Sequence, residues 1–518
     1  MLNIIKMKKK KLVCVVMAMA CAAPTFAGGL LTNTNQNVAF NRMMSREASI
    51  GIDGVYYNPA GVVFMNQGHH LSINWQLAFQ SRTIENDYSW FTNNVSNPTT
   101  PRTTKGKAFA PVIPSFQYAY NKGKWSFQGN FALTGGGGKC TFDNGLGSFE
   151  KIVAETAIGA CQLAQGVDKV AAAYNLPAAF STDQRFGKDG KYSYESYMHG
   201  RQYYYGLSLG AAYKISEHFS AFAGVRGVYA SCNYYGYVKN IKVGNMPLYQ
   251  VLDPTKENAA NIELSCDQTG IGFTPIIGVD FKTGRWNFSA KYEFKTRMRL
   301  KNKSVNQIPS IGNLADNLRN AYVAAGVPEQ MAQQVLGNQA VQGAMLNLKT
   351  QFKTKIDDAL GEYEDGKKIA ADIPAYLTLG AGYSPVDAVR INVGFHFFDD
   401  KNATSYNDRN KLLKRGTLEY NAGVEVDVCK KVTLSTGWQS TNYGLSDEYM
   451  DDKSFVTSSN SAAIGGVYHI SKKMDLSVAY FRTFYSHMKT EEQGIDNIYS
   501  SDYTRNNNVF AVGLDINF

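Results

Sequence analysis

The chain has 518 residues and a formal net charge of +10, with 47 glycines, 32 tyrosines and 28 phenylalanines. This enrichment in aromatic residues and glycine predicts an all-β protein. After the N-terminal segment, no apolar run reaches the roughly 18 residues that indicate a transmembrane helix. Removal of residues 1–27 would take five lysines and no acid, lowering the net charge to +5, so the basic balance does not indicate nucleic acid binding.

The N-terminus has the pattern of a secretory signal. Lys6 and Lys8–Lys11 precede a short apolar stretch, Leu12–Ala23, and small residues follow up to Ala27. The stretch is shorter than the roughly 20 residues that span a bilayer. We therefore expect residues 1–27 to be a signal peptide that is cleaved on export. Cys21 offers a lipoprotein signal as the alternative, but the residue three before it is not the usual Leu.

Five cysteines remain after the signal peptide, an odd number, so at least one has no disulfide partner within the chain. Two loop disulfides are plausible in an oxidising compartment, Cys140 with Cys161 and Cys232 with Cys266, although spacing alone leaves the connectivity open. Cys429 is the fifth. These cysteines show no metal-ligand spacing, and no metal or cofactor is expected.

Apolar and polar residues alternate from residue 68 to the C-terminus. In Leu71–Gln80, one face is apolar and the other carries Ser, Asn and Gln. The alternation is more pronounced in Lys291–Leu300, because Lys, Glu, Lys, Arg and Arg share one face. A strand with one apolar and one polar face fits a barrel wall between lipid and a lumen. Taken alone, each strand also fits a soluble sheet with a solvated face.

The connections favour the barrel. We expect fourteen strands, at residues 68–83, 109–120, 124–134, 200–214, 218–238, 268–282, 285–302, 371–384, 388–399, 415–429, 431–443, 458–470, 474–489 and 505–518. Tight turns alternate with longer loops, the longest at about 84–108, 135–199, 239–267 and 303–370. Outer-membrane barrels have this asymmetry between short periplasmic turns and long outer loops, whereas a soluble sandwich has no reason to keep it. The prediction is a 14-stranded antiparallel transmembrane β-barrel over residues 67–518.

The C-terminal strand supports export to an outer membrane. Phe510, Val512, Leu514, Ile516 and Phe518 share one face of this last strand. An aromatic C-terminus on an amphipathic strand resembles the signal that the outer-membrane insertion machinery reads. The expected location is therefore the outer membrane of a Gram-negative bacterium.

Two of the long loops contain helical patterns. Apolar residues recur at near-helical spacing over residues 149–174 and again between Leu314 and Ile356. We expect short amphipathic helices over the outer mouth of the barrel. Two roles remain open for them: covering the barrel with their own apolar faces buried, or contacting the substrate directly.

Residues 28–66 precede the first strand and have no strand pattern. The segment is rich in Gly and Asn, yet Ile50, Ile52, Val55 and Tyr56 make it too apolar for a disordered chain. We therefore expect it to fold as a plug inside the lumen.

This plug carries the residues of a family resemblance. Tyr57, Asn58, Pro59, Ala60 and Gly61 match the aromatic-Asn-Pro-Ala-Gly motif in the N-terminal hatch of FadL-type transporters of long-chain fatty acids and other hydrophobic compounds. Residues 371–375, leading into the strand at 380–383, resemble the strand that follows the large helical loop in that family. The chain departs from the family where the acidic and alanine-rich run before the motif is reduced to Asp53 and Gly54, which affects the expected conformation of the hatch.

The resemblance implies capture of the ligand at the outer loops, passage to a lumen pocket and release sideways through the wall. Gly135–Gly138 lies where the family tends to break its wall. A carboxylate ligand would need a positive charge near the pocket, and the candidates on the predicted lumen face are Arg226, Lys291, Lys295, Arg297 and Arg299. The alternative role for these cations is pairing with lumen acids such as Glu293.

Three other functions are alternatives to transport: an enzyme, an open porin and a surface adhesin. An enzyme lacks support, because the chain has no G-x-S-x-G motif and no phosphate-binding loop. An open porin would not need the plug, while a barrel-anchored adhesin stays untested. Aromatic hydrocarbons or other lipids are the alternative substrates. Because a closed barrel has no free sheet edge, we expect a monomer.

Overall fold

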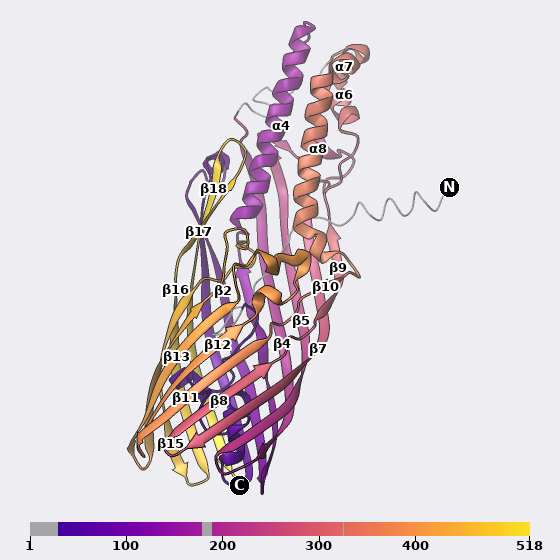
Figure 1. Ribbon diagram of the computed structural model, residues 1–518. Coiled ribbons are helices and arrows are strands. Elements are labelled where there is room, and N and C mark those ends of the chain that lie inside the picture. Colours follow the sequence, from indigo (N-terminus) through magenta and orange to yellow (C-terminus); the bar gives the residue numbers. More distant parts are fainter. Residues whose placement is uncertain (1–29, 179–188, 325) are drawn as a thin grey trace, which may run out of the picture.

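The computed structural model describes residues 30–178, 189–324 and 326–518. The strands form a closed barrel, the N-terminal helices lie inside its lower half, and long helices rise above its upper end (Figure 1). The predicted signal peptide, residues 1–27, lies outside the described residues.

Eighteen strand segments occur in the described part of the chain, and they form the fourteen wall strands of an antiparallel barrel. Three of these wall strands each consist of two consecutive segments (β8 with β9, β10 with β11, β16 with β17). β6 is a two-residue segment in an outer loop. The segments are β1 (Gly68–Asp87), β2 (Arg102–Lys122), β3 (Trp125–Phe142), β4 (Tyr192–Lys214), β5 (Phe219–Val243), β6 (Met246–Pro247), β7 (Ile262–Thr283), β8 (Trp286–Glu293), β9 (Arg299–Gln307), β10 (Lys368–Ala370), β11 (Tyr376–Val386), β12 (Val389–Phe398), β13 (Thr417–Cys429), β14 (Val432–Asn442), β15 (Ser459–Ser471), β16 (Met474–Tyr485), β17 (Met488–Gln493) and β18 (Ile498–Asn517).

The barrel closes where β1 pairs with β18, in a ladder from His70 opposite Asn517 to Asp87 opposite Ser500. Closure leaves the wall without a sheet edge. The expected alternation is confirmed in β1, where Trp75 is exposed on the outside and Asn74 is buried inside. A polar interior and an apolar exterior are the pattern of a barrel that spans a membrane.

The strands around the largest loops are longer than their sequence patterns indicate. β4, for example, begins at Tyr192 rather than at residue 200, and β5 extends to Val243. These extensions rise above the membrane-facing apolar belt, so both of their faces can carry polar residues and the alternation that marks a strand is lost.

One predicted strand, residues 285–302, is interrupted in the structure. Glu293 of β8 stands opposite Ile276 of β7, and Lys301 of β9 stands opposite Thr269 of β7. Between these two pairs, the wall strand formed by β8 and β9 has one residue more than β7. A one-residue shift turns every following side chain to the opposite face. The prediction of one continuous charged lumen face from Lys291 to Leu300 is therefore wrong beyond Glu293.

The N-terminal segment forms three short helices within the barrel: α2 (Val38–Met43), α3 (Gly54–Tyr57) and η1 (Gly61–Phe64). Asn37 caps α2, because its side-chain oxygen accepts a hydrogen bond from Ala39 N at 2.7 Å. Almost every residue from Thr32 to Val63 is buried, as expected for a plug.

The outer loops carry helices at the predicted places. The expectation of short helices is wrong for two of them, α4 (Gly147–Ala173, 27 residues) and α8 (Gln339–Leu360, 22 residues). The smaller helical elements of the loops are η2 (Ser89–Asn93), α5 (Tyr249–Leu252), α6 (Leu314–Ala324), α7 (Glu329–Leu336), η3 (Gly361–Tyr363), η4 (Asp400–Asn402) and η5 (Tyr406–Leu412). In the described chain, no helix is both long and apolar enough to cross a membrane.

α4 and α8 pack side by side and bury their apolar faces against one another and against the top of the barrel (Figure 1). Phe149 and Leu163 of α4 share this core with Val335 of α7 and Met345 of α8. Burial of the helices' own apolar faces is the first of the two roles left open by the sequence. We call residues 147–173 together with 314–360 the helical cap.

The expected disulfides do not form. No disulfide joins the five cysteines of the described chain, and Cys140, Cys161, Cys232 and Cys266 are buried. Cys140 belongs to β3 and Cys232 to β5, where their side chains pack in the apolar core at the top of the barrel. The residues expected in loops therefore serve mainly as small apolar side chains.

Candidate functional site in the barrel lumen

Residues 30–66, the described part of the predicted plug, contain the Tyr57–Gly61 motif, and we call this segment the hatch. The Tyr57 hydroxyl accepts a hydrogen bond from Gln36 N at 3.0 Å and donates one to Thr34 O at 2.8 Å. Its ring stacks on Phe40, with centroids 5.2 Å apart. Tyr57 therefore fixes the position of the N-terminal extended segment of the hatch, at Thr34 and Gln36, relative to its helices.

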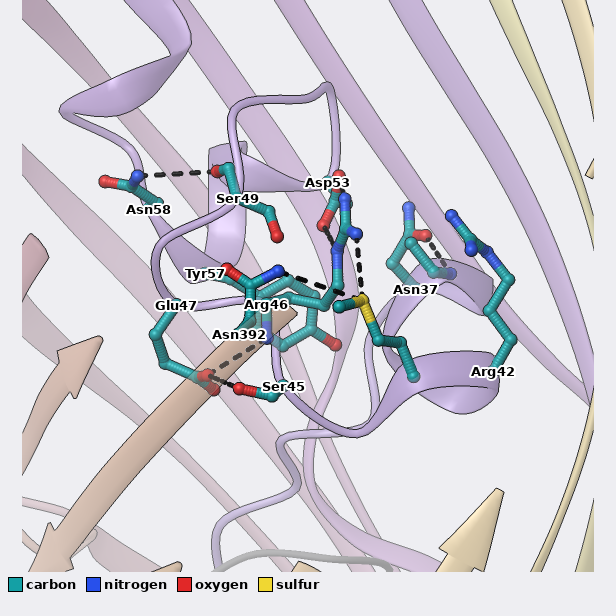
Figure 2. Close-up of polar contacts among 12 residues, drawn as sticks. Asn37, Arg42, Ser45, Arg46, Glu47, Ser49, Asp53, Tyr57, Asn58 and Asn392 are labelled. Atoms are coloured by element: carbon teal, nitrogen blue, oxygen red, sulfur yellow. Dashed lines mark hydrogen bonds and ion pairs between the residues drawn. The ribbon is translucent and has the colours of Figure 1, made fainter. Parts of the chain in front are cut away.

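Asn58 joins the hatch to the barrel wall. Its side-chain nitrogen donates to Asp280 Oδ2 of β7 at 2.6 Å and lies 3.4 Å from Ser49 O (Figure 2). Its side-chain oxygen accepts from Gly61 N at 3.1 Å, which stabilises the turn between α3 and η1. Asn58 thus has both the turn-forming role expected from the sequence and a second role, as the partner of a buried acid.

The rest of the motif is held through its backbone. Gln128 of β3 donates to Pro59 O at 2.7 Å, and Ser220 of β5 donates to Ala60 O at 2.7 Å. Gly61 has no room for a side chain, since a Cβ there would lie 2.4 Å from the Asn58 side-chain nitrogen. The motif is therefore anchored to three strands of one side of the barrel, and we call Tyr57–Gly61 the anchor.

The opposite side of the hatch contacts β12 and β13 through charged groups. His396 Nε2 lies 2.7 Å from Glu47 Oε1 of the hatch, and His396 Nδ1 lies 2.8 Å from Glu419 Oε2 of β13. Thr441 of β14 donates to the second oxygen of Glu419 at 2.6 Å. A histidine thus bridges two buried carboxylates, one from the hatch and one from the wall.

A second charged cluster surrounds Glu425 of β13. Arg46 of the hatch donates to both oxygens of Asp53, at 2.7 and 3.0 Å (Figure 2). It also donates to Glu425 Oε2 at 2.9 Å. Arg42 of α2 pairs with the other Glu425 oxygen and donates to Ser435 at 3.0 Å. Buried charges are tolerated only when they are paired and hydrogen-bonded, so these contacts depend on one another. We call Arg42–Asp53 with its wall partners the latch.

Glycines in the wall allow the latch to lie close to the strands. A Cβ on Gly423 would lie 2.1 Å from Met43 O, and a Cβ on Gly437 would lie 1.7 Å from the same atom. Gly394 would place its Cβ 2.4 Å from Glu47 Oε2. Glycine inside a strand often marks such a close approach of another backbone.

Two of the candidate ligand-binding cations lie in the lumen and are paired. Arg226 donates to both oxygens of Glu293, at 2.5 and 3.1 Å, and Lys291 donates to Glu293 Oε1 at 2.8 Å and to Tyr56 O at 2.7 Å. The Lys291 nitrogen lies 4.2 Å from the centre of the Tyr56 ring. Arg226, Lys291 and Glu293 thus form a charged centre that contacts the hatch through the backbone of Tyr56.

The space beside this centre is small. A cavity of about 10 Å³ is lined by Thr32, Arg226, Glu293 and Tyr376, among other residues. Such a volume holds about one water molecule. A long acyl chain requires the hatch to move before it can enter here.

The other three candidates, Lys295, Arg297 and Arg299, do not join this lumen group. All three are exposed, because the register shift after Glu293 turns them away from the lumen and places Thr296 and Met298 inside. Lys295 and Arg299 approach Asp372, at 4.0 and 2.6 Å. Their assignment to the lumen face is wrong.

The wall is interrupted beside the hatch. The β2–β3 ladder stops at Phe109 opposite Lys139 and resumes at Ser115 opposite Ala132. The extended segment Leu31–Asn33 of the hatch bonds to β3 at this place, since Asn33 N donates to Thr134 O at 2.9 Å and Gly136 N donates to Leu31 O at 3.2 Å. The hatch thus forms hydrogen bonds with backbone groups of β3 at the place where β3 is not paired with β2.

Sequence reasoning found the anchor and missed most of the latch. Glu47 and Arg46 belong to the hatch, but their partners His396 and Glu425 lie 349 and 379 residues away in the chain. The available signal was the lumen-facing acids on β13, which alternate with apolar residues. That signal reveals a charged lumen position and not the partner that meets it.

The sequence has no match among protein-family models or curated proteins. The structure resembles solved structures at low sequence identity. The crystal structure of a Pseudomonas aeruginosa FadL homologue matches with a TM-score of 0.58 and 13% identity, covering 95% of this chain and 100% of that one.

Two further matches have the same architecture. The Ralstonia pickettii toluene transporter TbuX matches with a TM-score of 0.51 and 14% identity over 93% of this chain and 98% of that one. The Pseudomonas putida toluene transporter TodX gives a TM-score of 0.50 and 11% identity over 90% and 94%. The fold is therefore that of the FadL-type transport channels, a 14-stranded barrel with an N-terminal hatch.

Proposed function

We propose that the protein transports hydrophobic compounds, most readily long-chain fatty acids, across the outer membrane of a Gram-negative bacterium. The observation that supports this most is the closed lumen beside an interrupted wall. The hatch lies inside the lower half of the barrel, and its extended segment Leu31–Asn33 bonds to β3 where β2 and β3 separate.

A plugged barrel suits an apolar solute better than an open pore. Moving a methylene group from hydrocarbon into water costs about 0.8 kcal/mol, so a long acyl chain in a water-filled channel would be strongly disfavoured. We propose capture at the outer loops, movement of the hatch to open a lumen pocket, and release sideways through the gap between β2 and β3. The pairing of Leu31–Asn33 with β3 supports this route, because displacement of the hatch would expose the interrupted wall.

The charge in the lumen favours a carboxylate-bearing ligand. Arg226 and Lys291 share the carboxylate of Glu293, and both carry further N–H donors that a ligand carboxylate could accept from once the hatch has moved. Aromatic hydrocarbons are the second candidate, because the barrel also has the fold of two toluene transporters. A neutral hydrocarbon would not use these donors.

The arrangement of the chain follows from this proposal. Residues 1–27 would be a signal peptide removed on export, residues 28–66 the hatch, and residues 67–518 the barrel. The insertion machinery would recognise the strand that ends at Phe518. We expect a monomer surrounded by outer-membrane lipid, because the closed wall needs no partner strand.

Uptake of radiolabelled oleate into a transport-deficient Gram-negative host would test the proposal. The host would express the wild-type chain or a hatch variant in which Asn58→Ala and Pro59→Ala break the anchor. A matched control carries Ser216→Ala and Glu217→Ala in an exposed turn between β4 and β5. Outer-membrane abundance would be equalised by immunoblot of folded protein.

We expect the wild type and the turn variant to take up oleate and the hatch variant to lose most uptake. The same cells given radiolabelled toluene would separate the two substrate classes. Toluene uptake without oleate uptake would overturn the fatty acid assignment and keep the transporter. Uptake of neither compound by an abundant, folded wild-type protein would overturn the proposed function.

A further inference from the structure

The outer surface of the barrel carries an unbalanced group of cations just above its apolar belt. Lys139 of β3 and Arg201 of β4 stand directly opposite one another in the ladder. Lys107 of β2 is the diagonal neighbour of Lys139, because Phe109 stands opposite Lys139. We call Lys107, Lys139 and Arg201 the cationic row.

The row points away from the lumen. Cys140, beside Lys139 in the chain, is fully buried, and Lys107 and Lys139 are exposed. Arg201 lies half-buried with its guanidinium 5.5 Å from the centre of the Tyr203 ring. Its Nε is buried and has no hydrogen-bond partner among the described residues.

Within the described chain, no acid stands opposite or diagonal to the Lys139–Arg201 pair. The neighbouring positions are occupied by Phe109, Lys107 and Pro111 on β2, by His199 and Tyr203 on β4, and by Asn233, Ser231 and Tyr235 on β5. Like charges directly opposite on a sheet are destabilising. The Lys139–Arg201 pair therefore has no acid beside it in the ladder, whereas Lys107 lines a hollow together with Asp143.

Other exterior cations near this height do have acids. Lys239 of β5 pairs with Glu263 of β7 at 2.9 Å, and Lys303 of β9 stands opposite Asp267 of β7. Lys105 of β2 has Glu85 of β1 as a diagonal neighbour. Arg482 of β16 is an exception, because it stands opposite Asn508 and Ala462, but it is a single cation, whereas the row brings three cations together over β2, β3 and β4.

The height of the row on the barrel wall indicates which part of the membrane it faces. Phe109, next to Lys139, is 52% exposed and stacks on Phe79 with centroids 5.0 Å apart. Below Arg201, the outward residues of β4 are Tyr203, then Tyr205 and Leu207. An aromatic girdle above aliphatic residues marks the boundary between hydrocarbon and headgroups.

A polar hollow of about 730 Å³ lies above the row and includes Lys107 in its lining. Two further cations and three acids line it: Arg102, which pairs with Glu150, and Lys105, Asp143 and Glu195. The hollow is large enough for sugar-sized groups and offers them hydrogen-bonding partners.

We propose that the cationic row binds the phosphate groups of a phosphorylated glycolipid in the outer leaflet. The row supplies three positive charges at headgroup height, the apolar belt below accepts the acyl chains, and the hollow above accepts the sugars. This inference rests on the location of the barrel in an outer membrane and is independent of the compound that it transports.

Native mass spectrometry of the full mature chain in detergent would test the binding. The probes are diphosphoryl lipid A, its fully dephosphorylated form and inorganic phosphate. The variant carries Lys107→Gln, Lys139→Gln and Arg201→Gln. The matched control carries Lys430→Gln, Lys472→Gln and Lys473→Gln, which remove the same charge from exposed turns at the opposite rim.

We expect the row variant to bind diphosphoryl lipid A about 10- to 100-fold more weakly than the wild type and the control, with little change for the dephosphorylated lipid. Lys139→Gln alone should weaken binding by a few fold, which serves as the milder test if the triple variant folds poorly. Equal binding by wild type and row variant, or equally strong binding of the dephosphorylated lipid, would overturn the proposal. Binding of inorganic phosphate at the row without binding of the lipid would overturn the assignment to a lipid headgroup.

Discussion

The hatch inside the barrel and the helical cap above it are held by different kinds of contact. The hatch is held by buried ion pairs and hydrogen bonds, such as Arg46 with Glu425 and Asn58 with Asp280. The helical cap is held by an apolar core that includes Phe149, Leu163 and Val335. Polar contacts are lost together when one partner is removed, whereas apolar contacts are lost roughly in proportion to the area uncovered. The hatch is therefore suited to an all-or-none movement and the cap to a stable cover.

Breaking the latch should have the largest effect. Glu425→Gln leaves Arg42 without its carboxylate partner and deprives Arg46 of one of its two. Removing one partner of a buried ion pair costs about 3–5 kcal/mol. Hydrogen exchange should show faster opening of residues 42–53 while the cap exchanges as in the wild type. Unchanged protection of the hatch would show that the latch does not hold it.

Truncation of an apolar side chain in the cap should have the next largest effect. Leu163→Ala removes a buried side chain from the contact of α4 with the neighbouring helices, at about 2–3 kcal/mol. Protection of amides in α4 and α8 should fall, with no change in the hatch. Gln162→Ala, an exposed position on the same helix, is the control. A coupled loss in the hatch would contradict the separation of the two regions.

The cap should also respond to pH through Asp452. Burial, with Asp451 nearby, raises the pKa of Asp452 from 3.8 to about 6, and its carboxyl accepts a hydrogen bond from Ser148 N at 2.7 Å. Because the folded pKa is raised, the contribution of this acid to stability is fully present below about pH 4 and is lost as the pH rises through about 6.

Protection of the first turn of α4, corrected for intrinsic exchange, should therefore fall by about 10- to 100-fold between pH 4 and pH 7. Asp452→Asn should flatten this dependence, and Asp447→Asn, at an exposed position in the same loop, should keep it. A pH dependence that survives in Asp452→Asn would assign the effect to another group.

Weakening the anchor should have a smaller effect than breaking the latch. Asn58→Ala removes one hydrogen bond to Asp280, which keeps Asn287 as a donor at 2.8 Å. Loss of a hydrogen bond to a buried charged group costs about 1–3 kcal/mol. Exchange should increase around residues 54–61. An effect larger than that of Glu425→Gln would reverse the ranking of the two contacts.

An exposed ion pair at the rim should have the smallest effect. Glu217→Gln breaks the contact of Glu217 with Lys214, where the Glu217 side chain is 80% exposed. Such a pair contributes about 0–1 kcal/mol. Urea unfolding of the barrel in lipid vesicles should show no shift beyond experimental error. A large shift would mean that rim charges, and not burial, set the energies compared above.

The sequence by itself determined the barrel, the positions of its strands and the presence of a plug. Alternation with period two, as in Leu71–Gln80, is a local property, because each strand of a membrane barrel meets lipid on one side and the lumen on the other. The Tyr57–Gly61 motif was found for a similar reason, since its turn residues are adjacent in the chain.

Tertiary structure alone decided which charges meet. Glu47 and Arg46 find their partners His396 and Glu425 only when the hatch enters the closed barrel. The single extra residue after Glu293 likewise turned Arg297 and Arg299 out of the lumen. The sequence pattern carries no sign of such a shift, because an alternating strand looks the same from either face and only pairing with a neighbouring strand fixes which face points inward.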